Sequence, residues 1–233
     1  MTKPKIIITI DGPAGAGKST ITRLLAQQLG LDCLDTGAMY RVVAWVLREE
    51  KKEEWSGEGL ALFLKDLDFT IEGTGPAQKV RVDGLDVSQE IRTPEISQLA
   101  SAISMKPEVR SFLAEKQKAY GSRGGLIAEG RDMGTVIFPQ ADYKFFLEAS
   151  LEVRAHRRFQ ELTQKGQSVS FEEVKQDMEA RDRQDQERAL APLRPAQDAH
   201  VVNTTQMSIE EVVKLICSKL IQFYPDLKIS GLS

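Results

Sequence analysis

Residues 6–19 read IIITIDGPAGAGKS, and this single stretch decides the fold class. Its first five residues are all β-branched and nearly all apolar, which is typical of a strand buried on both faces of a parallel sheet. The segment from Gly12 to Ser19 matches G-x-x-x-x-G-K-S/T, a pattern whose glycines let backbone N–H groups turn towards phosphate oxygens. A helical pattern starts at Lys18, so a helix N-terminus faces the same phosphates. Strand, loop and helix in this order predict a phosphate-binding loop in an α/β domain.

The last two residues of this loop predict its chemistry. Lys18 supplies a point charge for the β- and γ-phosphates of a nucleotide, and the Ser19 hydroxyl is placed to ligate Mg²⁺. The loop alone does not identify what receives the phosphate, because GTPase switches, motor ATPases and small-molecule kinases share it. The sequence has no Asn-Lys-x-Asp motif for reading guanine, which counts against a GTPase.

Beyond the loop, strand-like and helix-like segments alternate along the chain, with one exception. Further strands are expected at residues 31–34, 126–129, 143–147 and 200–203, and helices at 18–29, 38–51, from Pro94, from Pro107, and at 151–164, 171–188 and 208–223. The exception is the region 66–90, where short strand candidates flank Asp83-Gly84, a strong two-residue hairpin signal. The pattern predicts a three-layer α/β core with a small antiparallel sheet inserted into it.

Length and composition narrow the class of protein. The 233 residues suffice for one sizeable α/β domain, and the net charge of −3 argues against a nucleic-acid-binding protein. No apolar run approaches the ~20 residues needed to cross a bilayer, and the apolar segment near the N-terminus is too short for a signal peptide. Cys33 and Cys217 lie far apart and are expected to be reduced thiols. We therefore expect a cytoplasmic monomer that acts without nucleic acid or membrane.

Three later segments, taken with the phosphate loop, resemble the bacterial cytidylate kinases. They read LDTGAMYR at residues 34–41, IAEGRDMGTVIFP at 127–139 and EARDRQDQER at 179–188, the last followed by Ala191-Pro192-Leu193. The resemblance runs from about Ile7 to Asn203. It implies an ATP:(d)CMP phosphotransferase, which uses ATP and Mg²⁺ to convert CMP or dCMP into CDP or dCDP.

The resemblance also implies a fold and a domain organisation. The fold would be the three-layer P-loop kinase fold of the nucleoside monophosphate kinases, with a five-stranded parallel sheet. The whole chain, 1–233, would form a single unit whose core comprises residues 1–62, 99–153 and 169–233. An antiparallel-β insertion that binds the monophosphate would span about 63–98, and a short helical lid about 154–168.

The spacing of arginines supports phosphoryl transfer independently of the resemblance. Arg181, Asp185 and Arg188 fall at i, i+4 and i+7, which puts two guanidiniums around one carboxylate on one helix face. Arg154, Arg157 and Arg158 form a similar pattern one helix earlier. Solvated salt bridges are the alternative explanation. Beside a phosphate loop, however, arginines of the same chain can stabilise the charge that spreads over a transferred phosphoryl group.

Roles for individual residues follow from the resemblance. ATP would be held by Gly12, Pro13, Ala14, Gly15, Ala16, Gly17, Lys18, Ser19 and Thr20, with Arg157 and Arg158 joining as the lid closes. CMP would be held by Thr36, Tyr40, Arg41, Ser101, Arg110, Arg131, Asp132, Arg181, Asp185 and Arg188. Lys18, Arg131, Asp185 and Arg188 would act in catalysis, and Ser19 and Glu129 would hold Mg²⁺.

Within the CMP group, Arg41, Arg131 and Arg188 would grip the phosphate, and Arg181 and Asp185 the ribose hydroxyls or phosphate. Tyr40 would line the pocket, although a core tyrosine explains its position nearly as well.

Choice of the base would rest on Asp132 and Ser101 at the cytosine amino group and Arg110 at the ring acceptors. A carboxylate accepts a hydrogen bond from that amino group but would face the carbonyl of uracil unfavourably. Without the resemblance, Ser101 is a plain helix residue and Arg110 a surface charge. Two other functions stay open at this point: a kinase for another small acceptor, such as UMP or shikimate, and a nucleotide-dependent switch that hydrolyses slowly without any acceptor.

Overall fold

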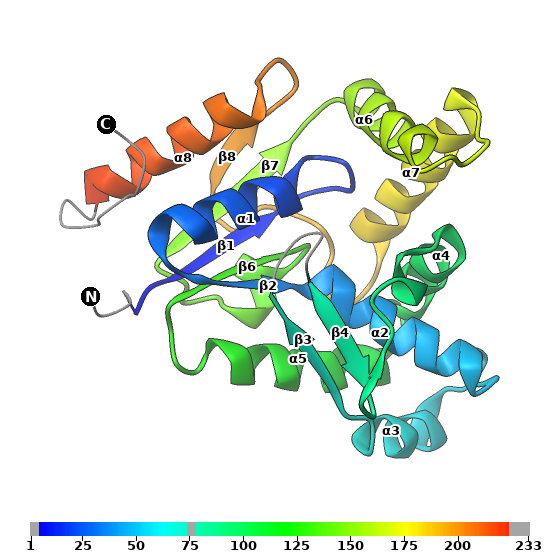
Figure 1. Cartoon of the computed structure of the whole chain (residues 1–233). Coiled ribbons are helices and arrows are strands. Elements are labelled where there is room, and N and C mark those ends of the chain that lie inside the picture. The colour runs from blue at the N-terminus through cyan, green and yellow to red at the C-terminus, as the bar shows by residue number, and fades with distance from the viewer. Residues whose placement is uncertain (1–4, 74–77, 224–233) are drawn as a thin grey trace. The chain divides into compact units, whose positions relative to one another are not determined.

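The strand expected before the phosphate loop is β1 (Ile7–Asp11), the central strand of a five-stranded sheet. The strand order is β2-β6-β1-β7-β8 (Figure 1), with β2 (Asp32–Asp35), β6 (Leu126–Gly130), β7 (Tyr143–Glu148) and β8 (His200–Asn203). Parallel pairing sets Ile8 beside Ile127 on one side and Tyr143 on the other. Ile8 and Ile10 are fully buried. The expected parallel sheet of an α/β core is confirmed.

The structure is a computed structural model that describes residues 5–73 and 78–223. The described residues up to Asp32 and from Gly124 onwards form one compact unit, which we call the core unit. Cys33–Arg123 form a second, which we call the inserted unit. The boundaries expected for an insertion at 63–98 and a lid at 154–168 stay predictions, and residues 1–4, 74–77 and 224–233 of the expected ranges lie outside the described residues.

The phosphate loop turns at Gly12, directly after β1. Gly12 has a φ of 147°, and a Cβ there would lie 2.2 Å from the carbonyl oxygen of Leu147 in β7. No other residue fits this place without moving the neighbouring strand. The loop leads into α1 (Lys18–Leu29), which ends at Gly30, as expected, with the Gly30 N–H donated to the Ala26 carbonyl.

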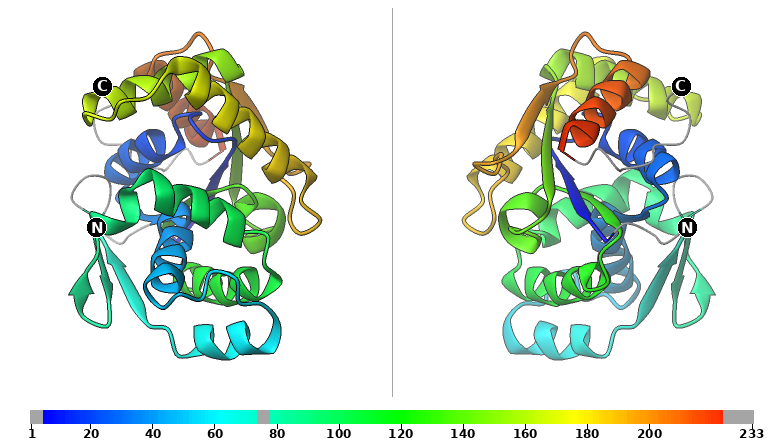
Figure 2. Two further views of the ribbon diagram at one scale, coloured as in Figure 1. Left: turned by 90° about the vertical axis from the view of Figure 1, so that its right-hand side faces the viewer. Right: turned by 90° about the vertical axis from the view of Figure 1, so that its left-hand side faces the viewer.

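Helices α1 and α8 (Ile209–Phe223) lie side by side over one face of the sheet, as the two views of Figure 2 show. The capping box expected at the start of α8 is present: the Ser208 N–H donates to Glu211 Oε2 at 2.7 Å, and the Glu211 N–H to Ser208 Oγ at 3.2 Å. Cys217 is fully buried between the two helices, where burial raises the pKa of its thiol to about 11. The thiol donates to Gln28 Oε1 of α1 at 3.4 Å.

α6 (Leu151–Gln164) and α7 (Phe171–Glu187) form a helical hairpin in the core unit (Figure 1). Ala155, Leu162, Val174 and Met178 fill the space between them. The expectation that Arg188 lies on the α7 face was wrong, because the helix ends at Glu187 and Arg188 is extended, with ψ of 138°. The chain reverses there, and the Leu193 N–H donates to the Asp185 carbonyl at 2.8 Å.

The described part of the inserted unit contains the helices α2 (Thr36–Glu49), α3 (Gly57–Lys65), α4 (Pro94–Ile103) and α5 (Pro107–Gly121) and a short 3₁₀ turn, η2 (Glu90–Arg92). It also contains the antiparallel strands β3 (Phe69–Glu72), β4 (Lys79–Val82) and β5 (Leu85–Asp86). Asp83 and Gly84 both have positive φ, of 48° and 82°, so the predicted hairpin turn is confirmed. Helix α2 begins two residues before the expected Ala38, because Asp35 Oδ1 accepts the Ala38 N–H at 2.9 Å. Helix α3 was not expected.

Candidate active site

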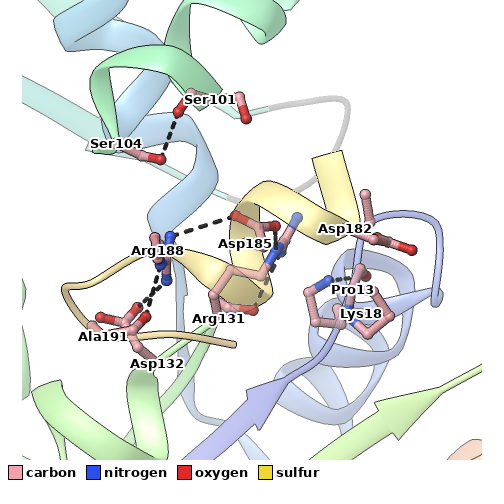
Figure 3. Close-up of polar contacts among 12 residues, drawn as sticks. Pro13, Lys18, Ser101, Ser104, Arg131, Asp132, Asp182, Asp185, Arg188 and Ala191 are labelled. Atoms are coloured by element: carbon pink, nitrogen blue, oxygen red, sulfur yellow. Dashed lines mark hydrogen bonds and ion pairs between the residues drawn. The ribbon is translucent and has the colours of Figure 1, made fainter. Parts of the chain in front are cut away.

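Lys18, the residue before the last one of the phosphate loop, has an almost completely buried side chain. Its Nζ donates to the Pro13 carbonyl at 2.7 Å, within the loop itself (Figure 3). Burial, and then the nearby charge of Arg131, lowers the pKa of Lys18 to about 7. The protonated ammonium therefore has less negative charge around it than it needs, and the phosphates of a nucleotide would supply that charge.

The two residues expected to hold Mg²⁺ meet in the structure. Ser19 Oγ donates to Glu129 Oε2 at 2.9 Å, and Glu129 lies buried near the end of β6. A hydroxyl and a carboxylate are hard oxygen ligands, and Mg²⁺ commonly binds through one or two protein oxygens plus substrate phosphates. The residues present therefore fit the ion.

Arg131, Asp185 and Arg188 form a cluster in the core unit (Figure 3). Arg131 Nε donates to Asp185 Oδ2 at 2.8 Å, and Arg188 Nη1 lies 3.5 Å from Asp185 Oδ1. Burial alone would raise the pKa of Asp185, but the charge and hydrogen bond of Arg131 hold it below its usual range. Burial likewise acts to lower the pKa of Arg131, and Asp185 outweighs this and raises it. Both groups are therefore ionised at neutral pH.

Arg181 and Asp132 interact electrostatically with members of this cluster. The charge of Arg181, on α7, acts on both Lys18 and Asp185. Asp132 is buried, with Oδ1 4.0 Å from Arg188 Nη2. It follows Arg131 at the end of β6 and opens η3 (Met133–Ile137), a π-helical turn that was not expected. The carbonyl of Asp132 accepts the N–H groups of Val136 and Ile137, at 2.9 and 3.2 Å.

The arginines of α6 do not form the cluster that their spacing indicated, so that expectation was wrong. Arg157 Nη2 donates to the Thr204 carbonyl at 2.9 Å, and Arg158 pairs with Glu161 at 2.8 Å on an exposed face. The third, Arg154, is buried and reaches the phosphate loop: its Nη1 donates to the Ala14 carbonyl at 3.1 Å. Positions i, i+3 and i+4 share one helix face, but the three long side chains extend to different partners.

Arg154 was not among the residues expected in the site. It also makes a bidentate ion pair with Asp182 of α7, at 3.1 and 2.6 Å. Its position three residues after Leu151, beside the apolar stripe of an otherwise charged helix, was the available signal that it faces inward.

In the inserted unit, two small groups contain the remaining expected residues. The first group lies at the start of α2, where Thr36 is the first helical residue and is buried. Tyr40, one turn later, is half-buried, and Arg41 Nη2 pairs with Asp35 Oδ2 at 3.3 Å.

The second group lies where α4 gives way to α5. Ser104 Oγ donates to the Ser101 carbonyl at 2.7 Å (Figure 3), and Arg110 Nη1 donates to the Ser104 carbonyl at 3.4 Å. Arg110 is only 9% exposed, so it is not a surface charge.

The family model for cytidylate kinase matches residues 8–222. The chain belongs to the cytidylate kinase family. It is 45% identical to the cytidylate kinase of Oleidesulfovibrio alaskensis, over 92% of this chain and 98% of the relative, and 46% identical to that of Aliivibrio salmonicida, over 91% and 95%. Among solved structures, an uncharacterized protein from Eubacterium ventriosum is similar with a TM-score of 0.50 at 12% identity, covering 94% of this chain and 99% of that one; this likeness concerns the fold alone.

As a cytidylate kinase, the chain is a phosphotransferase that phosphorylates CMP or dCMP with ATP. Its five-stranded parallel sheet and its small three-stranded antiparallel sheet are the fold expected of a nucleoside monophosphate kinase. Within the described residues, no helix is both long and apolar enough to span a bilayer.

Proposed function

We propose that the γ-phosphate of ATP, held by the phosphate loop, passes directly to the phosphate of CMP or dCMP, with Lys18, Arg131, Asp185 and Arg188 as the catalytic groups. The observation that carries this proposal is the Arg131–Asp185–Arg188 cluster at the carboxyl end of the sheet, in a region where Lys18 also feels the charge of Arg131. Phosphoryl transfer needs positioned positive charge rather than a strong base. A buried arginine pair on one carboxylate provides positioned guanidiniums of this kind.

On the donor side, residues Gly12–Thr20 bind the phosphates of ATP. Lys18 exchanges its bond to the Pro13 carbonyl for the β- and γ-phosphates. Arg157 and Arg158 join when the lid closes. Arg158 makes only an exposed ion pair with Glu161, which stabilises little and is readily given up for a phosphate.

Ser19 Oγ and Glu129 would hold the Mg²⁺ that accompanies ATP, Glu129 directly or through water. When bound, the ion neutralises charge that develops on the β- and γ-phosphate oxygens. The chain itself orients the two ligand groups, because the 2.9 Å hydrogen bond between them keeps Ser19 Oγ and Glu129 Oε2 together near the start of α1.

On the acceptor side, Arg41, Arg131 and Arg188 bind the phosphate of CMP, and Arg181 and Asp185 its ribose hydroxyls or phosphate. Asp185 has a second task, because its contacts at 2.8 and 3.5 Å orient the guanidiniums of Arg131 and Arg188. Thr36 and Tyr40 also contribute to binding CMP. The enzyme acts as a cytoplasmic monomer without nucleic acid, which gel filtration at working concentration tests for the oligomeric state.

The base is read by Asp132 and Ser101 at the cytosine amino group and by Arg110 at the ring acceptors. Asp132→Asn is therefore expected to reduce the preference for CMP over UMP by about 1–3 kcal/mol, the usual contribution of a good contact to a base edge. The ratio of kcat/KM for the two acceptors measures this effect. Asp142→Asn is the matched control, because Asp142 accepts the Ile7 N–H at 2.8 Å at the opposite end of β1. An unchanged ratio in Asp132→Asn would show that another residue reads the base.

The function as a whole is tested by a coupled assay of ADP release with Mg²⁺-ATP and a panel of CMP, dCMP, UMP and AMP. We expect CMP and dCMP to have the highest kcat/KM. Faster reaction with UMP or with a non-nucleotide acceptor would contradict the assignment of the acceptor. ADP release that does not depend on any acceptor would indicate a nucleotide switch instead.

A further inference from the structure

Asp11, the last residue of β1, carries a buried carboxylate for which the roles above have no use. Only 4% of the residue is exposed, and it lies directly before Gly12, where the phosphate loop begins. Its Oδ1 accepts the Met133 N–H at 2.9 Å, and its Oδ2 accepts the Gly134 N–H at 2.8 Å. Both carboxylate oxygens of Asp11 therefore accept hydrogen bonds from two consecutive backbone N–H groups of a segment that is distant in the sequence.

Those two N–H groups come directly after Arg131 and Asp132 in the chain. In the sheet, Asp11 is also the register partner of Gly130, the residue before Arg131. Residues 130–134 therefore form a short arc that is fastened to Asp11 at both ends, by strand pairing at Gly130 and by the carboxylate at Met133 and Gly134. Arg131 and Asp132 lie between these two attachments.

The chemistry of the contact requires a carboxylate. Two N–H donors aimed at one side chain need two acceptors, and an ionised Asp has acceptors only. Burial, and to a smaller extent the charge of Asp132, raises the pKa of Asp11 to about 6, while the N–H groups of Gly134 and Met133 and the charge of Lys18 act to lower it. A buried charge is costly unless it is hydrogen-bonded, so these bonds are what keep it in place.

The arc also packs tightly against β1. A Cβ added at Gly134 would lie 3.0 Å from Thr9 Oγ1 and 3.4 Å from Asp11 Oδ2. The backbone at Gly134 consequently has little room to shift, and a displacement at this position would be passed to Asp132, two residues earlier.

We propose that Asp11 is a positioning residue for acceptor recognition, which fixes Arg131 and Asp132 by holding the backbone of Met133 and Gly134. Because Asp11 adjoins Gly12, one residue ties the entry of the donor loop to the segment that reads the acceptor. This inference rests on the acceptor-binding roles proposed above for Arg131 and Asp132.

Asp11→Asn tests the proposal with almost no change in volume. The amide oxygen still accepts one N–H, but the amide NH₂ meets the other donor, and the arc loses one attachment. We expect the KM for CMP to rise about tenfold, the size of one lost charged hydrogen bond, with the KM for ATP changed less than about threefold and the CMP:UMP ratio of kcat/KM lowered. A merely structural role would instead lower the melting temperature and leave the two KM values and the ratio alone.

Asp142→Asn is again the matched control, since it makes the same chemical change on a carboxylate that binds the backbone at the other end of β1. It is expected to keep the wild-type KM values. If Asp11→Asn does not fold, Gly134→Ala decides the question, because its methyl group pushes the arc away from Thr9 and Asp11 without removing the carboxylate.

Equal rises in the KM for CMP and ATP in the folded variant, or no rise in either, would overturn the proposal. The acceptor-binding roles of Arg131 and Asp132, on which the proposal rests, are tested separately in variants that retain Asp11. If Asp132→Asn alone leaves base preference unchanged, the proposed reading of the base fails whatever Asp11→Asn shows. If Asp132→Asn behaves as expected and Asp11→Asn leaves the KM for CMP unchanged, only the role of Asp11 fails.

Discussion

Replacing Lys18 with methionine or alanine is expected to remove about 3–5 kcal/mol of transition-state stabilisation, a loss of ~10²–10⁴ in kcat/KM. In the function proposed above, this ammonium is the charge that the phosphate loop places next to the β- and γ-phosphates. The fold should remain intact. The pKa of Lys18 is already lowered to about 7 by burial and by Arg131, so removing a cation that is costly to bury does not weaken the unliganded protein.

Lys144→Met provides the contrast for this experiment. Lys144 is equally buried, but its Nζ is fully engaged, with the Pro139 carbonyl at 2.6 Å and both oxygens of Asp198 at 2.9 and 2.7 Å. Its loss should lower the free energy of unfolding by about 1–3 kcal/mol and leave kcat nearly unchanged. Urea denaturation and the coupled assay together measure both quantities. Near-normal turnover in Lys18→Met would remove Lys18 from the mechanism.

Arg131→Met is expected to have the second large effect, because it removes the guanidinium that we propose binds the acceptor phosphate and leaves the buried Asp185 without its 2.8 Å partner. We expect kcat/KM for CMP to fall by ~10²–10⁴ and the free energy of unfolding to fall by about 3 kcal/mol, as when one partner of a buried ion pair is removed.

The stability loss has a definite pH dependence. The pKa of Asp185 lies below its usual value in the folded protein, so its ion pair stabilises the fold above the unfolded pKa and loses this contribution as the pH falls through the folded pKa. In Arg131→Met this acid-side loss of stability should shrink, because Arg188, 3.5 Å away, is the remaining close partner among the described contacts of Asp185.

A double variant separates stability from catalysis. Adding Asp185→Asn to Arg131→Met removes the buried carboxylate that lost its 2.8 Å partner. We therefore expect the free energy of unfolding to recover in part while kcat/KM stays low. Wild-type activity in Arg131→Met, or recovery of activity along with stability in the double variant, would mean that Arg131 acts only through the fold.

Local sequence patterns were sufficient for most of the fold. β1, α1 and the Gly30 stop, the helices that start at Pro94 and Pro107, and the Asp83-Gly84 turn all came from residues adjacent in the sequence. Helix α3 and the π-helical turn η3 were missed. η3 depends on carbonyl and N–H partners around Asp132 that only the folded segment brings together.

For the candidate site too, local sequence patterns predicted some features and not others. The phosphate loop was predictable, since a loop of glycines, a lysine and a serine is a continuous pattern with one known use. The roles of the acceptor-site residues stay predictions. Which arginine faces which partner was not predictable: Arg154, rather than Arg157 or Arg158, reaches the loop across 140 residues of sequence. On α7, Arg188 departs from the helix and still contacts Asp185, because the chain reverses at that residue.

By itself, the sequence determined the fold class, the phosphate loop and the family, because each can be recognised from the hydrogen-bonding and packing properties of short continuous segments. Only the tertiary structure decided how Asp11 holds Met133 and Gly134, over separations of 122 and 123 residues. The physical reason is the parallel sheet: the register of β1 against β6 brings Asp11 beside Gly130, and no local periodicity encodes that register.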